Sequence, residues 1–120
     1  MIDKYSTKKE VLQAVKHYGG YLADASKELR GDREVVLEAV KSNGFALEDA
    51  SEELKNEREI VLEAVQQYTY ALEYASEELK NDREVVMQAL RQNRCAWEFV
   101  SDELQLEIIN LWLDFMEENK

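Results

Sequence analysis

"ALEYASEELKNDREVV", residues 71–86, is the third copy of a sequence repeat in this chain. It appears upstream as "ALEDASEELKNEREIV" from Ala46 and as "YLADASKELRGDREVV" from Tyr21. When residues 33–56 are aligned with residues 58–81, 17 of the 24 positions are identical. The same period of 25 residues relates Leu29, Leu54, Leu79 and Leu104. Internal repeats of this length indicate a solenoid or a stacked array.

Each repeat is predicted to hold two short helices. The chain has no proline and only four glycines, and good helix formers dominate it. The first helix would begin at Asn56 or Asn81, and its apolar residues Ile60 to Val65 form a stripe wide enough to pack on both sides. The second helix would carry Ala46, Leu47, Ala50 and Leu54 on one buried stripe, and Gly44 suits a left-handed turn between the two helices. We therefore expect an all-α fold.

The predicted architecture is a compact, α-solenoid-like array of helix-turn-helix repeats in one domain. The units are placed at about residues 6–30, 31–55, 56–80 and 81–105, giving eight or nine helices in all. A final segment, about residues 105–118, carries an apolar stripe through Ile108, Leu111, Trp112 and Phe115. We expect this segment to be a capping helix that closes the open end of the core.

Net charge, the length of apolar stretches and cysteine content limit the classes of function and the compartment that the sequence allows. The formal net charge of −11 argues against direct binding to nucleic acid or to anionic membranes, which requires basic patches. No stretch approaches the roughly 18 apolar residues of a membrane span. Cys95 is the single cysteine, which favours a reducing compartment, and we predict a cytoplasmic protein.

Nothing in the sequence indicates an enzyme, a cofactor or a metal site. His17 is the only histidine and is interpreted as structural or solvated. Cys95 has no identifiable base and is interpreted as a small buried or semi-exposed residue, not a nucleophile. The acidic pairs, such as Glu52 with Glu53 and Glu77 with Glu78, recur at the repeat period. Acid–base catalysis needs one pair in divergent environments instead. The recurring Arg33, Arg58 and Arg83 are expected to form surface ion pairs.

The stretch "GFALEDASEELKNEREIVLEAVQ" resembles the repeat known as domain of unknown function 4116. The residues that match the first half of its pattern are Ala46, Leu47, Ala50, Ser51, Glu53, Leu54 and Lys55, and those that match the second half are Glu59, Val61, Leu62, Ala64 and Val65. The likeness covers about residues 20–104. The family's Asn-Gly turn becomes Tyr68-Thr69 and Asn93-Arg94 here, which puts the turn geometry in question. The resemblance implies that the repeats form a tandem array, as they do in other family members, some of which are exported into host cells. It implies no catalytic residue.

The positions that change between repeats point to an interface. They gather at the turn after the first helix, in "KHYGGY", "KSNGFA", "QQYTYA" and "RQNRCA", and again at Asp24, Asp49, Tyr74 and Phe99. Repeat proteins conserve packing positions and vary one binding face. Aromatic and guanidinium groups are typical interface anchors. The predicted partner-binding residues are Tyr18, Tyr68, Tyr70, Tyr74 and Arg94. The alternative interpretation is that some of the tyrosines only pack over helix ends.

The sequence thus predicts a non-catalytic protein–protein interaction module, an adaptor or inhibitor whose partner carries a basic surface. The resemblance extends this to a small bacterial effector acting in a host-cell cytosol. Two alternatives stay open, namely an acidic mimic of nucleic acid and a purely structural repeat segment. Interspersed Lys and Arg count against the mimic, because mimicry needs a contiguous negative surface.

Overall fold

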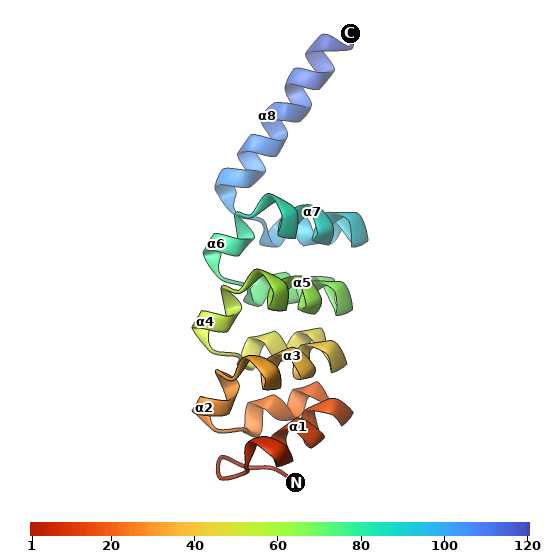
Figure 1. Cartoon of the computed structure of the whole chain (residues 1–120). Helices are drawn as coiled ribbons and strands as arrows, with labels where there is room; N and C mark the ends of the chain where they lie inside the picture. The colour runs from red at the N-terminus through yellow and green to blue at the C-terminus, as the bar shows by residue number, and fades with distance from the viewer.

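Four repeat units stack like rungs of a ladder, and one helix projects from the last rung (Figure 1). The computed structural model describes residues 1–120 and contains helices but no strands. The α-helices are α1 (Lys8–His17), α2 (Lys27–Arg30), α3 (Arg33–Ser42), α4 (Glu52–Lys55), α5 (Arg58–Gln67), α6 (Glu77–Lys80), α7 (Arg83–Gln92) and α8 (Asp102–Glu118). The 3-10 helices are η1 (Gly19–Asp24), η2 (Gly44–Asp49), η3 (Thr69–Tyr74) and η4 (Arg94–Phe99). The all-α repeat array is confirmed, with twelve helical segments in place of the eight or nine expected.

Each unit opens with a ten-residue α-helix, and in α1, α3 and α7 a side chain caps its start. Thr7 forms a capping box with Glu10, and the carboxylates of Asp32 and Asp82 accept from the N–H groups of Val35 and Val85. The prediction that Asn56 and Asn81 cap these helices is wrong. They end the preceding short helices, and the N-cap residues are one position later, at Glu57 and Asp82. The side chain of Asp82 makes a capping hydrogen bond, whereas that of Glu57 makes none.

The second half of each unit is broken, where the sequence predicted one helix. In the second unit, η2 ends before Ala50, whose backbone is extended, and Ser51 then caps the new helix α4 by accepting from the N–H of Leu54 at 3.3 Å. The serine hydroxyl therefore replaces the backbone partner that a continuous helix would supply. Ala50 and Leu54 remain buried, so the apolar pattern survives the break.

Gly44 is not in the left-handed conformation that the sequence suggested, since no residue of the chain has a positive φ. Close packing is the reason for glycine at this position. A Cβ there would lie 2.3 Å from the carbonyl oxygen of Ala64, on the long helix of the next unit. Gly19 has the same relation to Ala39, at 2.2 Å. These glycines let the 3-10 segment of one unit touch the long helix of the next.

The core runs the length of the stack. The long helices pack each on the next, and Ile60, Val61, Ala64 and Val65 of α5 are fully buried as the wide stripe predicted. The molecule measures 62 × 21 × 18 Å, with a radius of gyration of 16.7 Å. A globular domain of this length would have about 14 Å. The array is therefore elongated, and the expectation of a compact shape is wrong.

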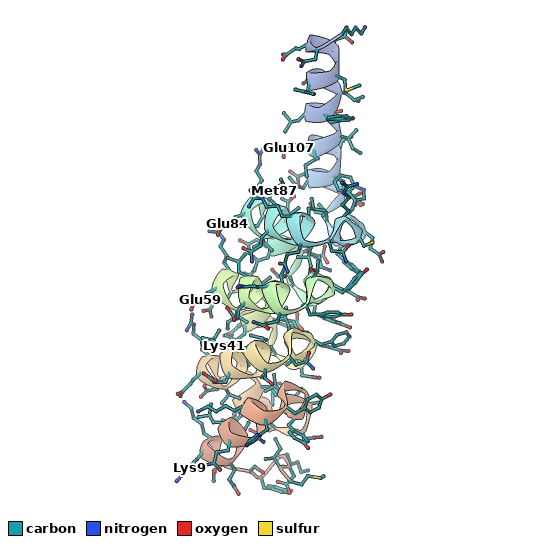
Figure 2. All side chains as sticks on the ribbon, turned by 90° about the vertical axis from the view of Figure 1, so that its right-hand side faces the viewer. Lys9, Lys41, Glu59, Glu84, Met87 and Glu107 are labelled. Atoms are coloured by element: carbon teal, nitrogen blue, oxygen red, sulfur yellow. The ribbon has the colours of Figure 1, made fainter.

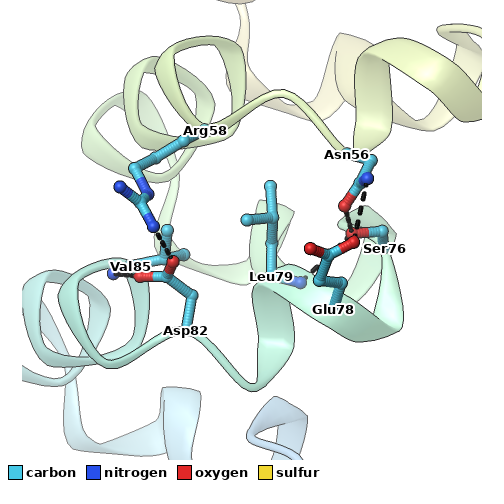
Figure 3. A network of polar contacts seen from close by, with 7 residues as sticks. All are labelled: Asn56, Arg58, Ser76, Glu78, Leu79, Asp82 and Val85. Atoms are coloured by element: carbon cyan, nitrogen blue, oxygen red, sulfur yellow. Dashed lines mark hydrogen bonds and ion pairs between the residues drawn. The ribbon is translucent and has the colours of Figure 1, made fainter.

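Two sets of polar contacts join consecutive units (Figure 3). In the first, the backbone N–H of Ser76 donates to the carbonyl of Lys55 at 2.9 Å, and its hydroxyl contacts Oδ1 of Asn56 at 2.5 Å. In the second, Arg58 pairs with Asp82. Both recur along the stack, since Ser101 repeats the first with Lys80 and Asn81, and Arg33 and Arg83 repeat the second. The predicted surface ion pairs are thus present, and they run between units.

Helix α8 does not close the end of the core, so the prediction of a capping helix is wrong. Leu106 holds the position at which Gly31, Asn56 and Asn81 end the short helices, and α8 continues through it without a break across Leu104. The helix then points away from the stack in both views of the molecule (Figure 1 and Figure 2). Only Leu104 of α8 is buried.

The repeat register explains why α8 forms no fifth layer. Residues 107–115 correspond, at the repeat spacing of 25, to residues 82–90, which are the N-cap and first part of α7. Glu107 pairs with Arg83 as Asp82 pairs with Arg58. Asn110 and Asp114, however, replace the fully buried Val85 and Ala89. Packing α8 as a fifth rung would bury an amide and a carboxylate without partners, which is costly.

Candidate interaction surface

The variable turns lie together at one edge of the stack. Tyr18, Asn43, Tyr68 and Asn93 are the residues that end the long helices, and each has an extended backbone. Their N–H groups still bond to the alanine carbonyl four residues earlier, as Tyr68 does to Ala64 at 2.9 Å. Backbone contacts therefore hold the turn in place while the side chain is left to vary. The turn has the same geometry at Tyr68 and Asn93, where the family's Asn-Gly pair is missing.

Five aromatic side chains from three consecutive units form a connected row, which we call the aromatic edge. Its members are Phe45, Tyr68, Tyr70, Tyr74 and Phe99. The ring centroid of Phe45 lies 5.3 Å from that of Tyr68 and 5.0 Å from that of Tyr74. Tyr70 continues the row, 5.6 Å from Tyr68 and 5.8 Å from Phe99 in an edge-on contact. These separations are those of favourable aromatic pairs.

The aromatic edge is only partly buried. Phe45 and Tyr68 are 39% and 37% exposed, and the other three rings are half-buried. Rings that hold one another in fixed positions while part of each surface meets water lose little conformational freedom when a partner covers them. The arrangement can therefore present a preformed apolar surface.

The structure brings together three of the five predicted binding residues. Tyr68, Tyr70 and Tyr74 belong to the aromatic edge. Tyr18 lies one unit earlier and makes its edge-on contact, at 5.3 Å, with Tyr21. Arg94 is exposed at the start of η4 and forms no ion pair.

Sequence reasoning missed Phe45 and Phe99 as binding residues, although both stand in the variable columns. Phe45 is 25 residues before Tyr70, and Phe99 is 25 residues after Tyr74. Reading those columns for aromatic character, and not for tyrosine alone, would have found them.

A hollow of about 490 Å³ adjoins the aromatic edge. Tyr18, Phe45 and Tyr68 line it together with Asp49 and amide side chains. Partial burial raises the pKa of Asp49, and nearby Asp24 adds to the rise, whereas the positive charges of Arg30 and Lys55 oppose it. A carboxylate beside aromatic faces is suited to a cationic group, which both can attract.

Two phenols of the aromatic edge, those of Tyr70 and Tyr74, have a raised pKa. Burial raises the pKa of Tyr74, and the carboxylates of Glu48 and Glu73 raise it further. The contact with the Cys95 side chain is the largest cause of the raised pKa of Tyr70. A tyrosine hydroxyl is protonated at neutral pH even at its ordinary pKa of 10.0, so both hydroxyls can donate hydrogen bonds to a partner.

Other reactive groups are dispersed. His17 ends α1 and Cys95 lies in η4, at opposite ends of the stack, so the two cannot act on one substrate (Figure 1). No group of three or more His, Cys, Asp or Glu side chains is placed to hold a metal ion. None of the helices combines the length and apolar character that crossing a bilayer requires.

Comparison with known proteins agrees with the repeat architecture. The family model described as "Domain of unknown function (DUF4116)" matches twice in tandem, over residues 8–55 and 57–105. Each match spans two of the structural units, and together they cover more than three quarters of the chain. No curated protein and no solved structure matches the chain. On the strength of the tandem family match, the chain belongs to the family of proteins built from the domain of unknown function DUF4116.

Proposed function

We propose that this protein is a non-catalytic protein-interaction module, an adaptor or inhibitor that binds its partner through the aromatic edge. The observation that carries the proposal is the row of five rings from three units, in contact with one another and partly open to water. Buried aromatic anchors supply much of the binding energy in protein interfaces. The rings also occupy columns that change between repeats, while the packing positions do not.

Charge supports a partner with a basic surface. The chain carries a formal net charge of −11, which attracts cationic surfaces over a Debye length of about 8 Å at physiological salt. The hollow beside the aromatic edge holds Asp49 among three aromatic rings. An arginine or lysine of the partner would find both a carboxylate and an aromatic face there. Family membership extends the proposal to a bacterial effector that acts in the cytosol of a host cell.

An acidic mimic of nucleic acid is a weaker candidate. Several carboxylates that such a mimic would need are engaged by the protein's own cations, as Glu57 and Glu59 are by Arg33 and Asp82 is by Arg58. A mimic requires a continuous row of free negative charge. A purely structural repeat segment would need no aromatic row at its variable edge.

The test compares two triple variants in quantitative pull-downs, followed by calorimetric titration with each partner that the wild type captures. One variant is Tyr68→Ala/Tyr70→Ala/Tyr74→Ala. Its matched control removes three exposed acidic side chains from the short helices and the start of α8, as Glu28→Ala/Glu53→Ala/Glu103→Ala. Circular dichroism first establishes that both variants are folded.

We expect the tyrosine variant to lose its partners and the glutamate variant to keep them. Loss in the glutamate variant alone, with competition by DNA, would replace the proposal with the acidic mimic. Retention of every partner by both variants would remove the aromatic edge as a binding surface and favour the structural segment.

A further inference from the structure

Helix α8 exposes more apolar surface than any other element. The side chains that are 44–61% exposed are Leu106, Ile109, Leu111, Trp112, Leu113, Phe115 and Met116. Its polar residues Glu107, Asn110 and Asp114 fall on one narrow stripe at helical spacing, and the apolar arc takes more than half of the circumference. Monomeric proteins rarely expose a continuous apolar surface of this extent, and such a surface marks a site of interaction.

The last repeat unit is uncovered as well. Its Leu90 and Trp97 are partly exposed, whereas Val65 and Leu72, the matching residues one unit earlier, are fully buried. Val86, Met87, Leu104, Ile108 and Leu111 line an apolar notch of about 150 Å³ between α7 and α8. The apolar face of α8 and the open end of the stack therefore form one continuous surface, which lacks the neighbour that covers every other unit.

We propose that a second copy of this chain covers that surface. The two α8 helices pack antiparallel, and the tip of each α8 lies against the open end of the partner's stack. The cap that the sequence suggested within one chain is in this way supplied by the other chain. Contact with both the partner's α8 and the partner's last unit accounts for an apolar arc too wide for a single helix–helix seam.

Charge favours the antiparallel arrangement. The far end of α8 carries Asp114, Glu117 and Glu118, and α8 itself contains no Lys or Arg. Glu117 pairs with Lys120 just beyond the helix, which leaves Asp114 and Glu118 as the free carboxylates of the tip. Arg91 and Arg94 of the last unit are exposed and form no ion pair within the chain. Antiparallel packing brings the acidic tip of one copy toward these arginines of the other. Parallel packing would set acidic tip beside acidic tip.

The available area is enough for a dimer. A half-exposed side chain of this size leaves roughly 100 Å² to be covered. Seven such residues on each copy correspond to roughly 1,400 Å² for the pair, against the 1,200–2,000 Å² of stable protein interfaces. The arrangement is isologous, since the same surface is used on both copies, and it closes at two.

Analytical ultracentrifugation of the whole chain tests the proposal with a matched pair of variants. Phe115→Glu places a new charge within the apolar arc, and Asn110→Glu adds the same charge to the polar stripe of the same helix. We expect wild type and Asn110→Glu to sediment with twice the 14.0 kDa mass of the chain, and Phe115→Glu to sediment as the monomer. A wild type that stays monomeric from micromolar to millimolar concentration would overturn the proposal, and so would a Phe115→Glu variant that stays dimeric.

Tryptophan fluorescence gives a second readout. In a Trp97→Phe background, Trp112 is the sole tryptophan, and it is 56% exposed in the single copy. Dilution through the dissociation range should shift its emission to longer wavelength as the partner leaves. An emission independent of protein concentration would contradict the proposal. A blue shift produced only by phosphatidylcholine vesicles would replace the second copy with a lipid surface.

Discussion

The guanidinium of Arg58 pairs with the carboxylate of Asp82, the residue that begins the long helix of the next unit (Figure 3). The other oxygen of the same carboxylate accepts from the N–H of Val85 at 3.1 Å. One side chain thus starts a helix and ties two units together. Asp32 does the same with Lys8 and the N–H of Val35.

This double use makes stability depend on pH in the acid range. Partial burial alone would raise the pKa of Asp82, but the N–H of Val85 and the charge of Arg58 outweigh it and lower the pKa below its ordinary value of 3.8. Asp32 is lowered in the same way by Val35 and Lys8. A carboxyl with a lower pKa in the folded state contributes stability that is complete above 3.8 and is lost as pH falls through the folded pKa.

The measurement is urea denaturation at a series of pH values, with Asp32→Asn/Asp82→Asn beside the wild type. Asparagine keeps the cap and loses the charge, because it too is a good N-cap residue. Comparing the two proteins at each pH removes the change in overall charge repulsion that acidification brings. We expect the stability difference between them to shrink as pH falls below 3.8. A difference that stays constant would show that these carboxylates contribute no charge-dependent stability.

The serine that caps each short helix has a separable role between units. Ser76→Ala should destabilise the protein more than Ser51→Ala, although both remove a cap worth about 1 kcal/mol. The hydroxyl of Ser76 also contacts Asn56, whereas Gly31 stands at the matching position before Ser51 and offers no side chain. The difference in free energy of unfolding, expected at about 0.5–1.5 kcal/mol, measures the contact between units. Equal losses would mean that the Asn56 contact adds nothing.

Truncating a side chain in the interior of the stack should lower the stability of the protein far more than truncating one on α8. Leu72→Ala removes a fully buried side chain and should cost about 2–5 kcal/mol in chemical denaturation. Leu106→Ala makes the same change at a residue that is 61% exposed and should alter stability by less than about 0.5 kcal/mol when measured on the monomer. Similar losses for both would place Leu106 in a core that the structure does not show.

Glycine substitutions test the close approach between units. Gly44→Ala would put a Cβ 2.3 Å from the carbonyl oxygen of Ala64 and should cost about 1–3 kcal/mol. Gly31→Ala is the matched control, because the nearest atom to its new Cβ lies at an ordinary 3.5 Å and its backbone suits alanine. That change should stabilise by about 0.4–1 kcal/mol through the unfolded state. The measurement is thermal unfolding of the two variants beside the wild type. A Gly44→Ala variant as stable as the wild type would contradict the close packing of Gly44 against Ala64.

The repeat was predictable because its packing residues are nearly invariant between copies. Ile60, Val61, Ala64 and Val65 could be assigned to the core from spacing alone, and they are fully buried. The break before Ser51 could not be read in this way, because Ala46, Leu47, Ala50 and Leu54 fit one helical stripe whether or not the helix is continuous. Asparagine and an acidic residue side by side also offered two possible N-cap positions, and the pattern led to Asn56 where the structure places the N-cap at Glu57.

The sequence predicted an aromatic surface at the variable turns, but it did not predict which rings would form it. Tyr68, Tyr70 and Tyr74 stood out as changes at otherwise regular positions, and the structure places them in contact. Which rings meet across units depends on the rise and rotation between repeats, and no single repeat encodes these. The projection of α8 was hidden for a related reason. Its apolar stripe matches a packed helix, and only the loss of the break at Leu106 and the polar Asn110 and Asp114 show that it cannot join the stack.

The contacts between units also bear on how quickly the chain can find its fold. The residues joined by side-chain hydrogen bonds between units are separated by only 20–26 positions, as Asn56 and Ser76 or Arg33 and Glu59 are. Closing such short loops costs little chain entropy, and proteins dominated by near neighbours along the sequence fold rapidly. Any adjacent pair of rungs can serve as the nucleus from which ordered structure spreads in both directions. As a ribosome releases this chain, each new unit would therefore emerge soon after the neighbour on which it packs.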